Sequence, residues 1–188
     1  KHAQPAPLSI SERHAHEIIY TGRLDAERRV DQLVTAFDQV HHKITDATLV
    51  IYGYGGELDR LKQQVSQLHL ETAVTFAGYQ PNLTMAYDQA GAYVYTGESD
   101  AQPLSLIEAL SHGVPAIAYD INYGPKDVLK DGKNGYLVTD GAVNQLVRAL
   151  TRTLESPQRQ QRLSKGAYRS SEQYSDEQVW QQWQPVVQ

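Results

Sequence analysis

Residues Gly97–Pro115 read GESDAQPLSLIEALSHGVP. The apolar segment Ala92–Tyr95, just before this stretch, is typical of a strand, and a polar loop leads from it to Pro103. Proline suits the first position of a helix, where its missing N–H group costs nothing, and Gly113 followed closely by a proline is typical of a helix end. The stretch therefore predicts a strand, a loop and a helix in succession.

The polar loop Ser99–Gln102 lies where a ligand would meet the start of this helix. Free backbone N–H groups and the helix dipole favour an anion at a helix N-terminus, so a phosphate group is the expected ligand. Two carboxylates, Asp100 and Glu108, bracket the loop and the helix. Taken alone, such a pair fits helix capping and solvation as well as it fits ligand binding.

Length and composition fit one folded domain. The chain has 188 residues, of which 40% are hydrophobic, and no shift in composition marks a second domain. It has no cysteine, which excludes disulfides and thiolate metal sites, and no run of about 18 apolar residues that would span a membrane. A net charge of −5 without a long basic block argues against a nucleic-acid surface.

Metal and nucleophile chemistry are not expected from the residue pattern either. The histidine pairs His14/His16 and His41/His42 lack both the i, i+4 spacing and the nearby third ligand of a metal site. No serine stands in a nucleophile elbow. We therefore expect no metal and no cofactor.

Short apolar segments alternate with longer amphipathic ones along the chain. The apolar segments predict strands at Glu17–Thr21, Thr48–Tyr52, Val74–Phe76, Ala92–Tyr95, Ala116–Tyr119 and Tyr136–Val138. Three helices are predicted after the last strand, at Ala142–Leu154, Pro157–Gln173 and Ser175–Trp183. Repeated strand–helix units predict an α/β fold, a Rossmann-like doubly wound parallel sheet of about six strands with helices on both faces. Ligands are then expected at the carboxyl ends of the strands.

The spacing of the two carboxylates resembles a known family. Asp100 and Glu108 have the acidic-x7-Glu spacing, followed by alanine and Gly-x-Pro, of retaining GT-B glycosyltransferases of family 4. In that family the second carboxylate holds the ribose of a sugar nucleotide and the first lies near the donor sugar. The sequence departs from the pattern because Asp100 replaces the usual Glu and Ala101 stands where Gly is common. The resemblance implies donor-binding residues at Asp100, Ala101, Gln102, Pro103, Leu104, Ser105 and Glu108.

A second motif, TGRLDAER at Thr21–Arg28, resembles the Gly-Arg-Leu segment of the same family. There the arginine and a lysine five residues later hold the donor diphosphate. The resemblance implies that Gly22, Arg23 and Arg28 bind the donor, and that both arginines act in catalysis together with Asp100 and Glu108. Arginine can take the lysine position because its planar fork of donors also binds phosphate. Without the family context, two solvated arginines near a helix start are the plainer interpretation.

Two further turns follow predicted strands. The glycine-rich turn at Gly53–Gly56 could cradle a phosphate or form a tight connection, and a dinucleotide fingerprint would need a third glycine where Leu58 stands. The segment Val74–Tyr79 resembles the loop that lines the nucleotide base in the same family. The resemblance thus implies Gly53 and Tyr79 as further donor-binding residues.

The resemblance extends from about His16 to Trp183. The segments Tyr123–Lys126 and Asn134–Val138 look like the subset that glycosylates bacterial surface polymers, notably poly(glycerol-phosphate) alpha-glucosyltransferases and relatives acting on adhesins. A plain turn before a strand is the simpler interpretation of Asn134-Gly135. The resemblance implies the C-terminal half of a GT-B enzyme that moves a hexose, glucose or N-acetylglucosamine, from a UDP-sugar to a surface polymer or glycoprotein.

On this basis we expect three segments in the chain. Residues 1–15 would be a linker from an N-terminal domain, residues 16–173 the nucleotide-sugar-binding domain, and residues 174–188 a helix that crosses back to the N-terminal domain. The expected partners are that domain, a sugar nucleotide and a polymer or protein acceptor, with no nucleic acid. The expected location is the cytoplasm, and peripheral association with the inner face of the membrane stays open.

Two other functional classes stay open at this point. A GT-B-like UDP-sugar 2-epimerase would release a free epimer without an acceptor. A non-catalytic nucleotide-binding module would give no turnover at all. The residues do not decide the base, the sugar or the acceptor.

Overall fold

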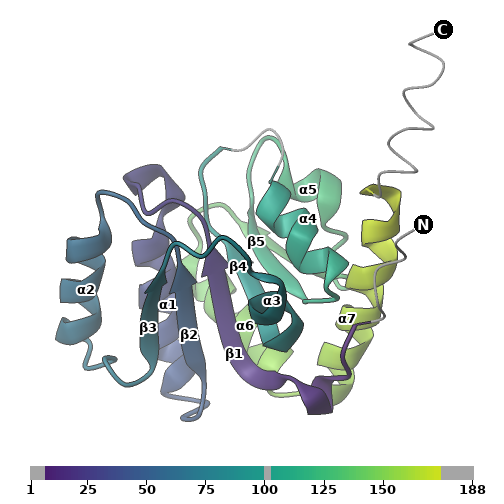
Figure 1. The fold of residues 1–188 in the computed structure, drawn as a ribbon, viewed down its shortest axis with the longest axis horizontal. Helices are drawn as coiled ribbons and strands as arrows, with labels where there is room; N and C mark the ends of the chain where they lie inside the picture. Colours follow the sequence, from purple (N-terminus) through teal and green to yellow (C-terminus); the bar gives the residue numbers. More distant parts are fainter. Residues whose placement is uncertain (1–6, 100–102, 175–188) are drawn as a thin grey trace, which may run out of the picture.

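The computed structural model describes residues 7–99 and 103–174. Within these ranges, six strands form one sheet in the order β3-β2-β1-β4-β5-β6, and every neighbouring pair is parallel (Figure 1). The strands are β1 (His14–Thr21), β2 (Thr48–Tyr52), β3 (Val74–Gly78), β4 (Ala90–Tyr95), β5 (Ala116–Asp120) and β6 (Gly135–Thr139). The predicted α/β fold with a doubly wound parallel sheet is confirmed.

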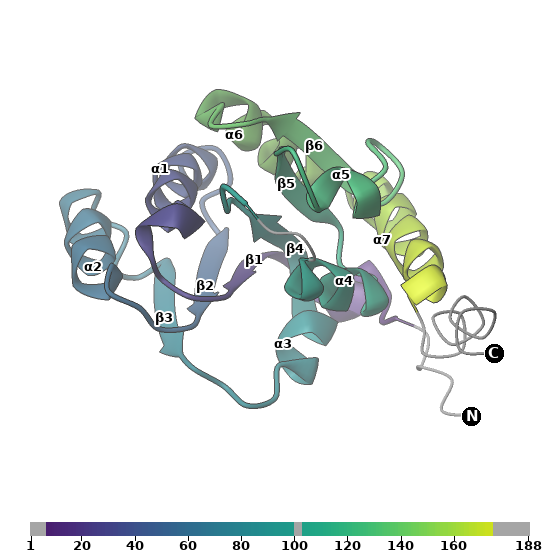
Figure 2. The same cartoon turned by 90° about the horizontal axis from the view of Figure 1, so that it is seen from above.

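Helices cover both faces of the sheet. Figure 2 shows α1, α2 and α6 on one face and α3, α4 and α7 on the other. The α-helices are α1 (Val30–His41), α2 (Leu58–Gln67), α3 (Thr84–Gln89), α4 (Leu104–Ser111), α5 (Pro125–Val128), α6 (Val143–Leu154) and α7 (Pro157–Ser171). Short 3-10 helices in the described ranges are η1 (Ile10–Glu12), η2 (Ala26–Arg28) and η3 (Glu172–Tyr174).

The six predicted strands are all present, and most differ from the prediction only at their ends. The first strand begins at His14, three residues earlier than predicted. The short helices α3 and α5 were not predicted, because four to six residues carry too little periodicity to stand out. The predicted helix at 175–183 lies outside the described residues.

The core lies on both faces of the central strands. Every residue of β4 is buried, and α1 places Leu33, Val34 and Phe37 against the sheet with no exposed surface. Burying each of these large apolar side chains contributes about 1.5–3 kcal/mol. A strand buried on both sides needs a continuous apolar run, which explains why these strands were visible in the sequence.

The connections after β1 and β4 set the place of the site. These two strands are neighbours, but β1 continues toward β2 while β4 continues toward β5, on the other side. The loops that follow them therefore diverge and leave a crevice at the carboxyl edge of the sheet, where doubly wound folds bind ligands.

Candidate functional site

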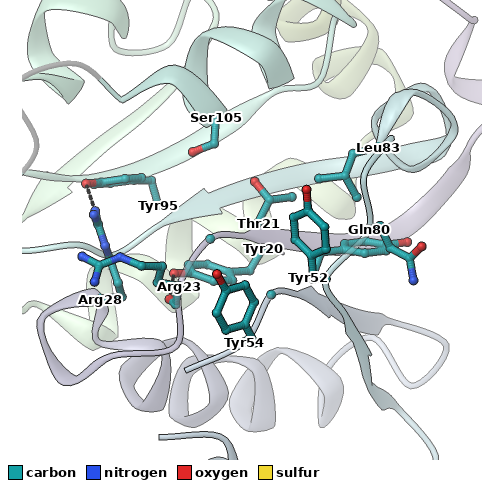
Figure 3. A pocket seen from close by; sticks show the side chains of 13 residues that line it. Tyr20, Thr21, Arg23, Arg28, Tyr52, Tyr54, Gln80, Leu83, Tyr95 and Ser105 are labelled. Carbon is teal, nitrogen blue, oxygen red and sulfur yellow. Dashed lines mark hydrogen bonds between the residues drawn. The ribbon is translucent and has the colours of Figure 1, made fainter. Parts of the chain in front are cut away.

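A cavity of about 420 Å³ lies at this carboxyl edge (Figure 3). It is built from the ends of β1, β2 and β4, the loops that follow β1, β2 and β3, and the start of α4. Its lining residues are Tyr20, Thr21, Gly22, Arg23, Arg28, Tyr52, Gly53, Tyr54, Tyr79, Gln80, Leu83, Tyr95 and Ser105. Its volume is within the range of small-molecule sites.

Segments far apart in the sequence bring several predicted site residues together here. The cavity is lined by the predicted residues Gly22, Arg23, Arg28, Gly53, Tyr79 and Ser105. Pro103 and Leu104 do not line it, and Leu104 is 61% exposed. Three further predicted residues, Asp100, Ala101 and Gln102, lie outside the described residues.

Pro103 precedes the helix rather than starting it, which corrects the sequence prediction by one residue. Its ψ of 79° is not helical, and α4 begins at Leu104. The Pro103 carbonyl accepts hydrogen bonds from the backbone N–H groups of Leu106 and Ile107, at 3.0 and 3.1 Å. A residue in this capping position supplies its carbonyl to the first turn while its own dihedrals stay outside the helix.

Glu108 lies one turn into α4, beside the cavity. The Tyr87 hydroxyl donates a hydrogen bond to its Oε2 at 3.2 Å, and the same hydroxyl lies 2.9 Å from the Oγ1 atom of Thr21, a lining residue. Burial raises the pKa of Tyr87 well above its usual value, so this hydroxyl stays protonated. Tyr87 thereby links the Glu108 carboxylate to the cavity wall.

Arg23 stands at the cavity mouth with its side chain 58% exposed. Its guanidinium forms ion pairs with Asp25 Oδ2 at 2.6 Å and Glu27 Oε1 at 2.7 Å. Exposed pairs of this kind contribute roughly 0–1 kcal/mol each, because water screens them. An anionic ligand that binds the Arg23 guanidinium would therefore replace these two ion pairs with little loss of free energy.

Arg28 is more enclosed than Arg23, with a side chain that is 21% exposed. Its Nη1 atom donates a hydrogen bond to the Tyr95 hydroxyl at 3.0 Å, as the dashed line in Figure 3 marks. The 3-10 turn η2 ends at Arg28 and brings its side chain to the cavity. The Arg28 Nε atom also lies 3.9 Å from Glu27 Oε1, so two guanidinium groups from one strand-to-helix turn stand at the cavity with carboxylates of the same turn beside them.

The glycine-rich turn after β2 is a tight connection. A Cβ atom on Gly53 would lie 1.8 Å from the carbonyl oxygen of Gly22, so the turns after β1 and β2 approach each other backbone to backbone. The Gly53 N–H group donates to the carbonyl of Gly78 at 2.8 Å. Because that donor is already used, Gly53 lines the cavity without offering its amide to a phosphate.

Four of the lining residues that the sequence analysis missed are tyrosines: Tyr20, Tyr52, Tyr54 and Tyr95. Tyr52 and Tyr95 end β2 and β4, and Tyr20 stands one residue before the end of β1. The exposed rings of Tyr54 and Tyr79 meet edge to face, with centroids 6.1 Å apart. The repeated tyrosine at strand ends was the sequence signal that could have identified Tyr20, Tyr52 and Tyr95.

His14, His16 and His42 each lie near a carboxylate, whereas the Nδ1 atom of His41 lies 3.0 Å from the Ala47 carbonyl oxygen. His14 Nδ1 lies 3.4 Å from Glu17 and His16 Nδ1 lies 2.9 Å from Asp46, around a second hollow at the opposite end of β1. Within residues 7–99 and 103–174, no group of three or more histidine, aspartate or glutamate side chains is arranged to hold a metal ion. Over the same ranges, no helix is both long and apolar enough to cross a bilayer.

Comparison with known proteins gives a family and several relatives. The family model "Glycosyl transferases group 1" matches residues 10–170. The UDP-N-acetylglucosamine–peptide N-acetylglucosaminyltransferase GtfA subunit of Streptococcus gordonii is 30% identical over 181 residues, which are 93% of this chain and 36% of that protein. The poly(glycerol-phosphate) alpha-glucosyltransferase of Bacillus subtilis strain 168 is 29% identical over 184 residues, 97% of this chain and 27% of that protein.

A solved structure shows the same likeness in three dimensions. The crystal structure of the pneumococcal O-GlcNAc transferase GtfA in complex with UDP and GlcNAc has a TM-score of 0.86 and 26% identity to this chain. The match covers 97% of this chain and 37% of that one. This chain therefore spans little more than a third of these relatives at most.

Proposed function

This chain belongs to the glycosyl transferases of group 1, and we propose that it is the donor-binding domain of a retaining enzyme of that family. Its fold is that of the Rossmann-like C-terminal domain of GT-B enzymes. In our proposal the donor is a UDP-sugar, and the enzyme moves glucose or N-acetylglucosamine to a bacterial surface polymer or glycoprotein. The acceptor and the activity belong to this proposal, because the chain spans 36% and 27% of the two curated relatives.

The observation that carries the proposal is the polarity of the cavity. Arg23 and Arg28 come from the loop after β1, whereas Tyr54 and Tyr79 come from the loops after β2 and β3, farther along the same edge of the sheet. The nucleoside diphosphate part of a sugar nucleotide has the same polarity, with a dianionic diphosphate at one end and a flat base at the other. Guanidinium groups bind the first through charge-assisted hydrogen bonds, and aromatic rings pack against the second.

The chemistry follows from where charge develops. When the bond between the anomeric carbon and the diphosphate oxygen breaks, its electron pair stays on the leaving diphosphate. Arg23 and Arg28 would stabilise that growing negative charge more strongly than they stabilise the bound donor, which lowers the barrier. Because these two cations stand at the cavity, we expect the reaction to need no metal ion. In this proposal Glu108 orients the donor by accepting hydrogen bonds from ribose hydroxyls.

We infer that an N-terminal GT-B domain covers the carboxyl edge of the sheet. Most of the large apolar side chains that are exposed in the described residues follow the carboxyl ends of strands or begin the next helix: Tyr54, Tyr79, Met85, Leu104 and Tyr123. Because these side chains follow the carboxyl ends of strands, on the edge of the sheet that holds the cavity, they support a partner surface at that edge. The cytoplasm remains the location we expect.

A labelling assay tests the proposal and separates the alternatives. Radiolabelled UDP-glucose or UDP-N-acetylglucosamine is incubated with a full-length enzyme containing this sequence, and separately with the 188-residue chain, each with a teichoic-acid-like polymer or a peptide. We expect label on the acceptor with the full-length enzyme only, since a closed two-domain cleft orients donor and acceptor. Acceptor labelling by the chain alone at a similar rate would contradict this division of labour.

The same assay distinguishes the other two classes. A free epimer released from the full-length enzyme without any acceptor would identify an epimerase. Absence of turnover in every pairing, with donor binding retained, would identify a non-catalytic module. The three curated or solved relatives described above are transferases by name, and no feature of the cavity favours the epimerase.

A further inference from the structure

The structure assigns a positioning role to Arg29, which follows Arg28 in sequence but does not line the cavity. We infer that the Arg29 guanidinium fastens the start of the β4–α4 connection, Thr96 and Gly97, to the turn after β1. Through that connection it sets the place of the Arg28 side chain. This inference rests on the proposed function, because its consequence is the binding of a diphosphate at Arg28.

The backbone conformation of Arg29 explains why the side chains of Arg28 and Arg29 lie in different places. Arg29 has φ 50° and ψ 38°, in the left-handed region, and stands between η2 and α1. This conformation costs roughly 1–2 kcal/mol for a residue with a Cβ atom, and glycine would adopt it without that cost. Contacts of the Arg29 side chain must offset the difference.

Those contacts join the ends of three strands. The Arg29 Nε atom donates to the Thr96 carbonyl at 2.8 Å, and Nη2 donates to the Gly97 carbonyl at 3.0 Å. Nη2 also lies 2.6 Å from Asp140 Oδ1, just after β6. The guanidinium stands 4.8 Å from the ring centroid of Tyr119 in β5, and the side chain is only 11% exposed. A planar fork satisfies all of these partners at once, whereas a single ammonium group would not.

Hydrogen bonds from the β4–α4 connection back to the turn after β1 couple the Arg29 contacts to Arg28. The Thr96 hydroxyl donates to the Arg28 carbonyl at 2.7 Å, and the Glu98 N–H group donates to the Glu27 carbonyl at 2.9 Å. The Arg28 guanidinium in turn donates to the hydroxyl of Tyr95, the residue before Thr96. Loss of the Arg29 side chain would therefore release the segment that holds Arg28 from two sides, its backbone and its guanidinium.

The test compares UDP and uridine binding by calorimetry in two Arg29 variants. Arg29→Gly removes the side chain and relaxes the backbone, so the chain should stay folded. We expect its Kd for UDP to rise about tenfold, which corresponds to the loss of one to two net hydrogen bonds to the diphosphate. The Kd for uridine should change less than about twofold. Arg29→Lys should lie between Arg29→Gly and the unmodified chain, because an ammonium group keeps part of the contacts.

A matched control is Arg159→Lys. Arg159 also donates a guanidinium hydrogen bond to a backbone carbonyl, that of Arg152 at 2.6 Å, but it does not line the cavity. Its substitution should leave UDP and uridine binding unchanged. Thermal unfolding of each variant is measured alongside, and if Arg29→Gly does not fold, Arg29→Lys carries the test.

The outcomes separate this inference from the proposed function. If the unmodified chain binds no UDP, the proposed function fails. If it binds UDP and Arg28→Ala weakens that binding, but both Arg29 variants bind UDP as the unmodified chain does, the positioning role is wrong. Equal losses for UDP and uridine in the Arg29 variants would also overturn it, since they would indicate general loosening of the fold.

Discussion

Glu108 is the residue whose place beside the cavity gives the simplest prediction. Its carboxylate accepts one hydrogen bond from Tyr87 and is otherwise exposed at the surface of α4. If it holds the ribose hydroxyls, Glu108→Gln keeps the shape and removes the charge that strengthens those bonds. UDP affinity should then fall by about 1.5–3 kcal/mol in calorimetry, and uridine affinity should fall equally because both ligands carry the ribose.

A control for this change is Glu172→Gln, an exposed glutamate at the end of α7, away from the cavity lining. It should bind UDP as the unmodified chain does. Unchanged UDP affinity in Glu108→Gln would remove Glu108 from the ribose site.

Substitution of Arg23 or Arg28 should affect UDP and uridine unequally, unlike Glu108→Gln, because in our proposal these arginines bind the diphosphate that uridine lacks. We expect Arg23→Ala and Arg28→Ala to weaken UDP binding much more than uridine binding in the same titrations. Arg28 should contribute more than Arg23, since its side chain is 21% exposed against 58%, and a less hydrated guanidinium binds anions more strongly. Equal losses for UDP and uridine would mean a general structural effect and no diphosphate clamp.

The turns after β1 and β2 pack closely against each other through Gly22 and Gly53, which both line the cavity. Gly53→Ala would place a Cβ atom 1.8 Å from the Gly22 carbonyl oxygen at a φ of 149°, so the two turns must separate. We expect a loss of about 1–3 kcal/mol in the free energy of unfolding, measured by urea denaturation.

Gly56→Ala, three residues along the same turn, is the matched control. A Cβ atom there would meet no atom within 4 Å, and its φ is not in the left-handed region. Its free energy of unfolding should stay within about 0.5 kcal/mol of the unmodified chain. Equal stability of Gly53→Ala and Gly56→Ala would show that the close approach of the turns is not needed.

The sheet was predictable from sequence because its strands are mostly apolar, and the central strand β4 is buried along its whole length. Continuous apolar runs such as Thr48–Tyr52 match the observed strand residue for residue. Short elements were not predictable in the same way, since α5 has only four residues and its proline and glycine equally fit a turn. Asn134 is a turn residue, as predicted, but it is also 1% exposed and bonded to Ser170 in α7, a contact that local sequence cannot indicate.

Some residues of the site were likewise predictable from local sequence, and others were not. Arg23 and Arg28 stood in a recognisable motif, and the loop after a strand is where such a motif meets a ligand. Arg28 and Arg29 look identical in the sequence, and only the left-handed backbone at Arg29 sends one to the cavity and the other to Thr96. The sequence correctly predicts Tyr95 as the last residue of a strand but not as a cavity residue, because the pattern along one strand does not reveal which strand ends meet in space.

For the whole molecule, buried tyrosines predict how stability depends on pH. Burial raises the pKa of Tyr93 to about 12 from an ordinary 10.0, and it also raises the pKa values of Tyr20 and Tyr87. The unfolded chain therefore releases these protons at a lower pH than the folded chain, so stability is complete below pH 10 and falls from pH 10 toward 12. Urea denaturation at several pH values in this window measures the fall.

Tyr93→Phe provides the control for this pH dependence. It removes one hydroxyl that titrates differently in the two states, at the cost of the hydrogen bond to Ser105. The fall in stability above pH 10 should be shallower in this variant, even though its stability at pH 7 is lower. An identical slope in both proteins would contradict the linkage to Tyr93.

The central claim is that the cavity at the carboxyl edge binds the donor nucleotide, and the most direct measurement is an NMR titration of the 188-residue chain with UDP. We expect saturable shifts of the backbone amides of Gly22, Arg28, Gly53 and Tyr79, which line the cavity. The amides of residues 14–16, at the second hollow, should not move. Absence of saturable shifts, or shifts that centre on residues 14–16 instead, would show that the cavity does not bind the nucleotide.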